Sequence, residues 1–284
     1  MIALEMTLMP PPRLMAVLAH PDDESLGFGG TLAKYASEGA DVSLLTATRG
    51  ESGRYRGHRQ GDDQHPGARA LARIRESELR AAASALGVCD LTMLDYPDQQ
   101  LDGAHPREAV AAIAGHFRRV RPDVVVTFGP DGAYGHPDHI AISQFTTAAV
   151  MAAAADHRFE FEGGDLGPPH AVSKLYYMAW PESTWAAYQA AFRQLVSTVD
   201  GVERQATPWP DWAITTVIDT SDVWPTVWRA VSCHESQVSA YGRLRDLSPE
   251  HHKALWGRQS FYRAISSVNG GRARENDLFE GIRT

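Results

Sequence analysis

A histidine and three acidic residues follow one another closely near the start of the chain. His20, Asp22, Asp23 and Glu24 come directly after the apolar run Leu14–Ala19. Capping of a helix accounts for one or two acids, because carboxylates suit a helix N-terminus. Like charges within ~4–6 Å disfavour each other's ionisation, so the crowding favours a bound cation. A dinucleotide site is disfavoured, because the following glycines do not match GxGxxG and the acids would repel a pyrophosphate.

A second cluster of the same residue types lies more than a hundred residues later. His136, Asp138 and His139 stand in the sequence GPDGAYGHPDH, directly after the apolar run at 123–128. Pro137 suits the first position of a new helix, which places all three side chains at the helix start. A His-x-x-His pair alone is common at helix starts, so the significance of this cluster depends on its place in the fold.

Short apolar runs alternate with helical patterns along the chain. The runs predict strands at 13–19, 41–47, 91–95, 123–128, 173–179 and 213–219. The helical patterns cover 24–38, 67–87, 106–120, 137–155, 182–196, 222–240 and 249–265. This alternation predicts an α/β fold, a Rossmann-like and mostly parallel sheet with helices on both faces. In the strand order 3-2-1-4-5 the first and fourth strands are neighbours, and ligands bind beyond their carboxyl ends. The two clusters should therefore face each other, which favours a metal site.

We expect one domain over 1–284. Its core at 13–150 carries both clusters, and a smaller C-terminal part at 151–270 packs at the sheet edge. Segments 49–66 and 156–170 read as long loops, and loops longer than ~12–15 residues are usually functional or mobile. The polar tail at 270–284 is expected to be loosely ordered.

Composition narrows the class of protein. The net charge of −8 argues against nucleic acid and anionic membranes as partners. No apolar run approaches the ~20 residues that span a bilayer, so no integral membrane contact is expected. The two cysteines imply neither a disulfide framework nor a thiolate metal site. With no signal-peptide pattern at the start, these features predict a cytoplasmic protein.

The motifs AHPDDE and GHPDH together resemble the two signatures of the PIG-L/LmbE-like superfamily of zinc-dependent N-acetylglucosaminyl deacetylases. The resemblance covers residues 13–150 and is diffuse beyond them. Tyr134, in YGHPDH, resembles the branch of the glucosaminyl-inositol deacetylases and mycothiol-conjugate amidase. The superfamily implies removal of an N-acetyl or other N-acyl group from a small amino-sugar substrate. Attack would come from a metal-bound water with an Asp as general base.

The resemblance implies a role for each residue of the two motifs. The zinc ligands would be His20, Asp23 and His139, and a hydrolytic zinc needs three such ligands and an open position. Asp22 would be the general base, and His136 the acid and oxyanion helper, oriented by Asp138. Tyr134 would assist the oxyanion or the leaving amine. We assign Glu24 to supporting contacts or helix capping.

Substrate contacts are predicted at two further residues. Arg75, in the pattern R-x-x-E-L, matches a family arginine that contacts sugar hydroxyls, although it could pair with a neighbouring glutamate. Asp98 matches a sugar-binding loop aspartate, although it could be a turn-former after Pro97. His234, in CHESQ, resembles a C-terminal H-x-S-Q pattern, although a helix histidine is more often structural. The loop at 48–53 should border the pocket.

Three alternatives stay open. Two histidines and one carboxylate also form the site of non-haem Fe(II) oxygenases, and Fe²⁺ could replace zinc in a hydrolase. The same ligands could serve an amidase that acts on a thiol conjugate. A metal-stabilised binding module would need no base, so the extra residues Asp22 and His136 favour catalysis. Homo-oligomerisation is a further open point.

Overall fold

The computed structural model describes residues 10–155, 167–185, 188, 196–199, 202–239, 244–271 and 273–282. Its centre is a seven-stranded sheet of order β3-β2-β1-β4-β5-β9-β8. Five strands are parallel: β1 (Arg13–Leu18), β2 (Asp41–Thr48), β3 (Asp90–Tyr96), β4 (Val124–Thr127) and β5 (Lys174–Met178). The predicted order 3-2-1-4-5 is confirmed. Two antiparallel strands, β9 (Arg258–Ser266) and β8 (Thr216–Asp219), continue the sheet beyond β5.

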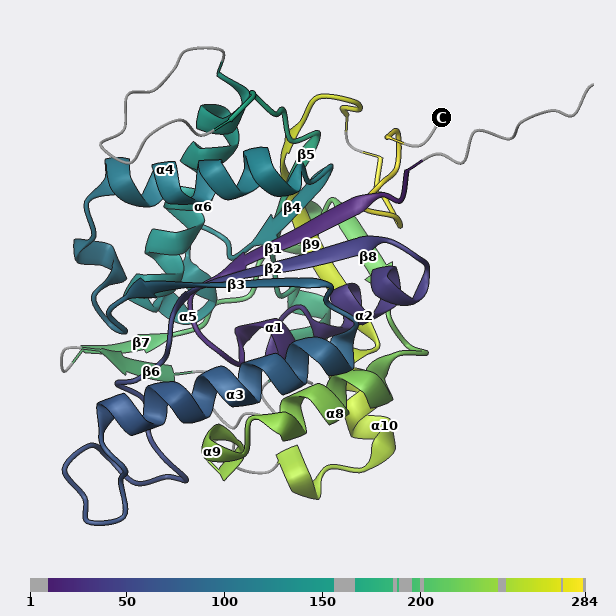
Figure 1. Cartoon of the computed structure of the whole chain (residues 1–284). Coiled ribbons are helices and arrows are strands. Elements are labelled where there is room, and N and C mark those ends of the chain that lie inside the picture. Colours follow the sequence, from purple (N-terminus) through teal and green to yellow (C-terminus); the bar gives the residue numbers. More distant parts are fainter. Residues whose placement is uncertain are drawn as a thin grey trace, which may run out of the picture.

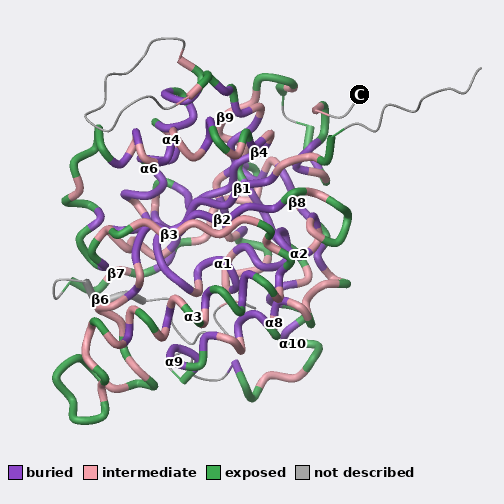
Figure 2. Tube along the Cα trace, viewed as in Figure 1, coloured by how far each residue is buried: buried purple, intermediate pink, exposed green. Residues whose placement is uncertain are grey.

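Helices cover both faces of this sheet (Figure 1). One face carries α4 (Pro106–Val120) and α6 (Pro137–Ala154), which pack on each other. The other face carries α1 (Asp23–Leu26), α2 (Gly29–Ser37), α3 (Ala68–Leu86) and α8 (Trp224–Cys233). Because both faces are covered, the central strands lack the alternation of a half-exposed sheet: every residue from Leu14 to Leu18 is at most 1% exposed. Figure 2 shows this buried centre.

Short elements connect or border these layers. They are the helices α5 (Gly132–Gly135), α9 (Glu235–Val238) and α10 (Pro249–Trp256), the 3-10 turns η1 (Leu101–Gly103), η2 (Glu182–Thr184), η3 (Asp211–Ala213) and η5 (Leu244–Asp246), and the hairpin of β6 (Val196–Val199) and β7 (Val202–Gln205). Within the described ranges, no helix has the length and apolar character needed to cross a membrane.

Three predicted helices are interrupted. The helix expected at 24–38 divides at Gly27–Phe28, and the one at 222–240 divides at His234. The helix expected at 249–265 ends at Trp256, and Gly257 leads into β9. Residues 258–266 carry aromatic and β-branched side chains that pair with both β5 and β8, so sheet pairing outweighs the helical pattern there. Most of the helix predicted at 182–196, and residues 156–166 of the predicted loop, lie outside the described residues.

The C-terminal part lies at the sheet edge, where it adds β9 and β8 to the sheet. The tail differs from the prediction, because residues 273–282 are not loosely ordered: Leu278 and Phe279 are fully buried, and Glu275 is 2% exposed. Glu275 accepts hydrogen bonds from Lys174 at 2.7 Å and Asn269 at 2.6 Å. Polar pairing therefore anchors a segment whose composition alone suggested disorder.

Candidate metal centre and active site

The carboxyl ends of β1 and β4 bring the two sequence clusters together. The strands pair directly, with Leu14 opposite Val124, so the chain leaves both at the same edge of the sheet. After β1 it turns at His20 and enters α1, and after β4 it passes through α5 into α6 at Pro137. The two clusters therefore meet at the point where the strand order reverses, as predicted.

Three side chains meet at one point in this crevice. His20 Nδ1 lies 3.1 Å from His139 Nε2, and the Asp23 carboxylate lies beside both, with Oδ2 3.6 Å from His20 Nδ1 and Oδ1 3.3 Å from His139 Nε2. Zinc–nitrogen bonds of 2.0–2.1 Å in a tetrahedron put neighbouring ligand atoms about 3.3 Å apart. These separations fit that requirement, so the three side chains could hold a zinc ion. His136 also approaches this point, with its ring centre 4.8 Å from that of His20.

The electrostatics around His20 favour positive charge. Burial alone would lower the pKa of His20, but hydrogen bonds with Asp138, Asp23 and Asp98 outweigh it and raise this pKa well above its ordinary value. Burial would raise the pKa of Asp23, yet His139 and His20 hold it well below the usual range. The carboxylates here are therefore ionised and surround a point where a cation is stabilised.

The far side of the His20 ring faces two carboxylates. His20 Nε2 lies 3.1 Å from Asp98 Oδ1 and 3.1 Å from Asp138 Oδ2. A hydrogen shared with these oxygens places one proton on Nε2, so a cation would bind at Nδ1 in place of the second proton. A carboxylate behind a metal-binding histidine orients the ring and raises its basicity.

This geometry changes the roles expected for Asp138 and Asp98. We expected Asp138 to orient His136, but its carboxylate contacts His20 and accepts from the backbone amides of Gln99 at 2.7 Å and Leu101 at 3.0 Å. Asp98, expected to contact the sugar, is 5% exposed and accepts from Ser52 N at 2.9 Å. Both carboxylates are committed to buried contacts behind the candidate metal centre.

His139 is positioned by stacking. Its ring lies 3.9 Å from that of Phe128, with an angle of 7° between the planes. Its Nδ1 is buried and has no hydrogen-bond partner within the part of the chain that the structure describes. The apolar ring of Phe128, which follows β4, therefore holds the orientation of the His139 ring. In metal-binding histidines this is usually done by a polar partner of the second ring nitrogen.

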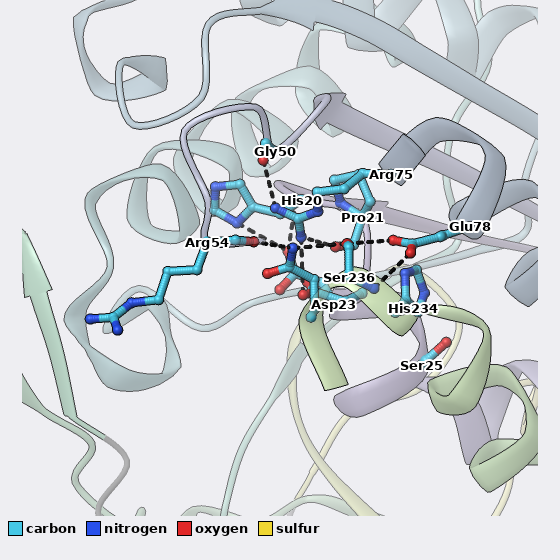
Figure 3. A network of polar contacts seen from close by, with 12 residues as sticks. His20, Pro21, Asp23, Ser25, Gly50, Arg54, Arg75, Glu78, His234 and Ser236 are labelled. Atoms are coloured by element: carbon cyan, nitrogen blue, oxygen red, sulfur yellow. Dashed lines mark hydrogen bonds and ion pairs between the residues drawn. The ribbon is translucent and has the colours of Figure 1, made fainter. Parts of the chain in front are cut away.

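Asp22 lies beside the three converging residues and is held from two sides. Arg75 Nη2 is 3.0 Å from Asp22 Oδ2, and the same guanidinium donates to the carbonyls of Gly50, at 2.8 Å, and Pro21 (Figure 3). Asp22 also has a backbone φ of +112°, which is strained for a residue with a side chain. Arg75 was expected at the substrate, but here it is 4% exposed and contacts Asp22.

His136 and Tyr134 are two hydrogen-bond donors next to His139. His136 Nδ1 accepts from Asp138 N at 3.2 Å, so the ring hydrogen is on Nε2. Burial, followed by the nearby His20 and His139, lowers the pKa of His136 to about 3. Tyr134 lies with its ring 5.1 Å from that of His139, and burial raises its pKa well above 10. Both groups are neutral donors.

A cavity of about 120 Å³ opens onto Asp22 and Tyr134. Its polar lining consists of Asp22, Asp23, Tyr134 and His139, and its remaining lining of Leu26, Gly27, Phe128, Ala133, Met178, Trp180 and Tyr188. No common motif marks this apolar wall in the sequence, because its residues come from separate elements. The signal that the sequence carries is a gathering of tryptophans between residues 180 and 228, to which Trp180 belongs.

His234 and Glu24 form a contact that the sequence analysis did not identify. His234 Nε2 lies 2.7 Å from Glu24 Oε1, and neither residue is exposed. Burial would raise the pKa of Glu24, but His234 lowers it below its ordinary value. The H-x-S-Q resemblance pointed to His234, but its partner could not be read from a distance of 210 residues along the chain.

Comparisons with known proteins show the family of this chain. Residues 15–150 match the family model described as PIG-L, GlcNAc-PI de-N-acetylase. A protein of Kineococcus radiotolerans named 1D-myo-inositol 2-acetamido-2-deoxy-alpha-D-glucopyranoside deacetylase is 37% identical over 314 residues, covering 96% of this chain and 83% of the relative. The chain belongs to the PIG-L de-N-acetylase family. As a PIG-L protein it is an enzyme, a hydrolase of N-acetyl amide bonds.

Solved structures of similar fold show that the architecture alone does not decide the chemistry. The 4-carboxy-2-hydroxymuconate hydratase GalB of Pseudomonas putida KT2440 aligns with a TM-score of 0.64 at 17% identity, covering 92% of this chain and all of that one. The N,N'-diacetylchitobiose deacetylase of Pyrococcus horikoshii aligns with a TM-score of 0.60 at 20% identity, covering 90% and 87%. The assignment to the PIG-L family therefore rests on the sequence relatives and the site residues.

Proposed function

We propose that this enzyme removes the acetyl group from an N-acetylglucosaminyl-inositol, using zinc held by His20, Asp23 and His139. The substrate class is taken from the name of the Kineococcus relative, which matches over almost the whole chain. The observation that carries the proposal is the convergence of the three ligand side chains at 3.1–3.6 Å with Asp22 beside them. A site that only held a metal would not need Asp22.

When bound, zinc would polarise the amide carbonyl and acidify a water molecule. Iron(II) fits the same ligand types, so the metal has to be identified by reconstitution. His20 would bind through Nδ1, because Asp98 and Asp138 hold the hydrogen on Nε2.

Asp22 would move the proton of the reaction. Its carboxylate lines the same cavity as Asp23 and His139, and Arg75 fixes its orientation. It would take a proton from the attacking water as the C–O bond forms. It would then deliver this proton to the sugar nitrogen as the C–N bond breaks, which gives acetate and a free amine.

His136 and Tyr134 would stabilise the oxygen of the tetrahedral intermediate. A proton on His136 Nδ1 would oppose the amide hydrogen of Asp138, so this ring serves as an Nε2–H donor rather than as the proton source. This proposal narrows the dual role predicted for His136 to oxyanion stabilisation. Removing one such donor typically costs about 10²–10³ in kcat.

The apolar lining of the cavity would receive the acetyl methyl group. Gly27 and Met178 face each other there, and a Cβ on residue 27 would lie 2.9 Å from Met178 Sδ. This close approach would limit the acyl group beside Asp22 and Asp23 to a small one. The sugar would then lie toward the loop at 48–53.

The test is release of acetate from N-acetylglucosaminyl-inositol, with N-acetylglucosamine as the shorter comparison. Metal-free protein is assayed alone, with Zn²⁺ and with Fe²⁺. We expect activity only with metal, and Asp22→Asn should keep the metal while kcat falls by about 10²–10⁴. Acetate release by the metal-free protein, or full turnover by Asp22→Asn, would contradict the proposal. A thiol conjugate in the same assay tests the amidase alternative.

The cytoplasmic location remains a prediction, and homo-oligomerisation remains an open point. Cell fractionation tests the first, and sedimentation of the purified protein tests the second.

A further inference from the structure

Glu24 is a fully buried carboxylate that lies next to the candidate metal ligands but points away from them. Its Oε1 faces His234 Nε2 at 2.7 Å and also accepts from the Ser25 hydroxyl. Its Oε2 accepts from the backbone amide of Asp22 at 2.9 Å. Glu24 therefore connects His234, at the C-terminal end of α8, to the backbone of Asp22.

The Asp22 backbone is the part of this chain of contacts that needs support. A φ of +112° and ψ of −25° is unfavourable for a residue with a Cβ, and such strain persists only where the surroundings impose it. The hydrogen bond from Asp22 N to Glu24 Oε2 fixes the peptide plane before Asp22. Arg75 fixes the carboxylate at the other end of the residue. Backbone and side chain are thus held by separate partners.

His234 is itself held firmly in place. It stands at the break between α8 and α9, with 0% exposure. Two residues later, Ser236 donates to Glu78 of α3 through both its amide and its hydroxyl, each at 2.7 Å (Figure 3). Gln237 Nε2 donates to the carbonyl of Arg54 at 2.7 Å. These contacts anchor the α8–α9 break to α3 and to the loop after β2.

A buried acid–imidazole pair is a poor way to stabilise a fold. Replacement of such pairs by apolar residues of similar volume is often neutral or stabilising. The pair of Glu24 and His234 does something that an apolar pair could not do. One Glu24 oxygen accepts a hydrogen bond from Asp22 N, and the other is held by the donor His234 Nε2. The arrangement is therefore explained by what it does to Asp22.

We infer that His234 and Glu24 are positioning residues, which hold Asp22 in its strained backbone conformation and so aim its carboxylate at the reacting water. The inference rests on the proposed function, in which Asp22 is the base. His234 touches neither substrate nor metal in this assignment, and it acts entirely through Glu24.

The experiment compares two amide variants of His234. In His234→Gln the side-chain nitrogen lies near the place of Nε2 and can still donate to Glu24. In His234→Asn it lies near the place of Nδ1, which has no hydrogen-bond partner among the described residues. With zinc-loaded enzyme and N-acetylglucosaminyl-inositol, we expect kcat to fall at least ~10-fold in His234→Asn, because small misplacements of a catalytic group are costly. KM and bound zinc should be unchanged, and His234→Gln should stay within about threefold of the wild type.

A matched control is His252→Asn, at another buried histidine. His252 is 5% exposed, and its Nε2 lies 2.7 Å from the carbonyl of Leu244. This variant should lower thermal stability and leave kcat unchanged at temperatures where it is folded. Equal losses in His234→Asn and His234→Gln, or loss of bound zinc in His234→Asn, would overturn the inference, as would wild-type kcat in His234→Asn. If Asp22→Asn retains turnover in the same assay, the proposed function fails instead.

Discussion

The guanidinium of Arg75 lies 3.0 Å from the carboxylate of Asp22 and bridges it to the carbonyls of Pro21 and Gly50. Arg75 comes from the middle of α3, and Asp22 from the turn after β1. The contact therefore joins a helix on the surface of the sheet to the residue that we assign as the base. It makes the base orientation dependent on α3 and on the loop after β2.

Replacing Arg75 should affect turnover more than substrate binding. In Arg75→Met, the uncharged side chain keeps much of the buried volume but cannot hold Asp22, so kcat should fall about 10²-fold. KM and bound zinc should change little. The control is Arg73→Met, because Arg73 is exposed on the same helix. A large rise in KM with unchanged kcat would instead favour the sugar contact predicted from the sequence.

Gly50 should be as sensitive as Arg75 itself. A Cβ on residue 50 would overlap Nη1 and Cζ of Arg75 and lie 2.8 Å from its Nε, so Gly50→Ala must displace the guanidinium. We expect a loss of kcat similar to that of Arg75→Met. Gly57→Ala is the control, since Gly57 also has a positive φ of +88° but a Cβ there would meet no atom of the described residues within 4 Å. If both glycine variants lose activity equally, backbone strain and not displacement of Arg75 is the cause.

Asp138 should determine how tightly the metal is held. Its carboxylate lies 3.1 Å from His20 Nε2, and carboxylates behind metal-binding histidines typically contribute 10–100-fold to metal affinity. Asp138→Asn should therefore lower zinc affinity by about this factor, measured by competition with a chelator. The exposed neighbour Asp102 supplies the control, Asp102→Asn. An unchanged affinity in Asp138→Asn would show that His20 does not depend on this contact.

Glu275 should contribute stability that depends on pH. Burial would raise the pKa of Glu275, but hydrogen bonds, first that from Lys174, lower it to about 2. Because the folded-state pKa is depressed, the stabilisation is complete above the unfolded pKa of about 4.5 and is lost as pH falls from there toward 2. A shift of this size corresponds to ~3 kcal/mol in the free energy of unfolding.

Urea unfolding of wild type and Glu275→Gln between pH 7 and pH 3 measures this contribution. The difference in unfolding free energy should be constant above about pH 5 and should shrink below it. Glu280→Gln, an exposed change in the same segment, should show no such trend. A difference that does not vary with pH would contradict the assignment.

The sequence predicted the site better than its surroundings. The ends of β1 and β4 and the two motifs that follow them could be predicted, because buried apolar runs are local signals. Their alternation with helical patterns predicts the parallel strand order and therefore the sheet edge at which both strands end. The contacts of Asp98, Asp138 and Arg75 could not be predicted, since each depends on the direction in which a buried side chain points. Composition does not specify that direction, and the matching partners lie 39 to 118 residues away in sequence.

The end of the sheet was the least predictable part of the fold. Residues 249–265 carry one continuous helical pattern, yet the chain changes to a strand after Gly257. Pairing with β5 and β8 decides this, and the pairing is a long-range property. The order of the tail could not be predicted for the same reason, because Glu275 is anchored by Lys174, which lies 101 residues earlier in the chain.

The position of β9 between β5 and β8 has a consequence for synthesis of the protein. Among the strands of the described residues, β8 joins the sheet only through β9, which is the last of them to be made. Until residues 258–266 leave the ribosome, β5 presents an unpaired edge and β8 has no strand to join. The first five strands can form early, but the sheet is complete only when nearly the whole polypeptide has been translated. A truncated product ending before β9 would therefore expose the β5 edge and aggregate.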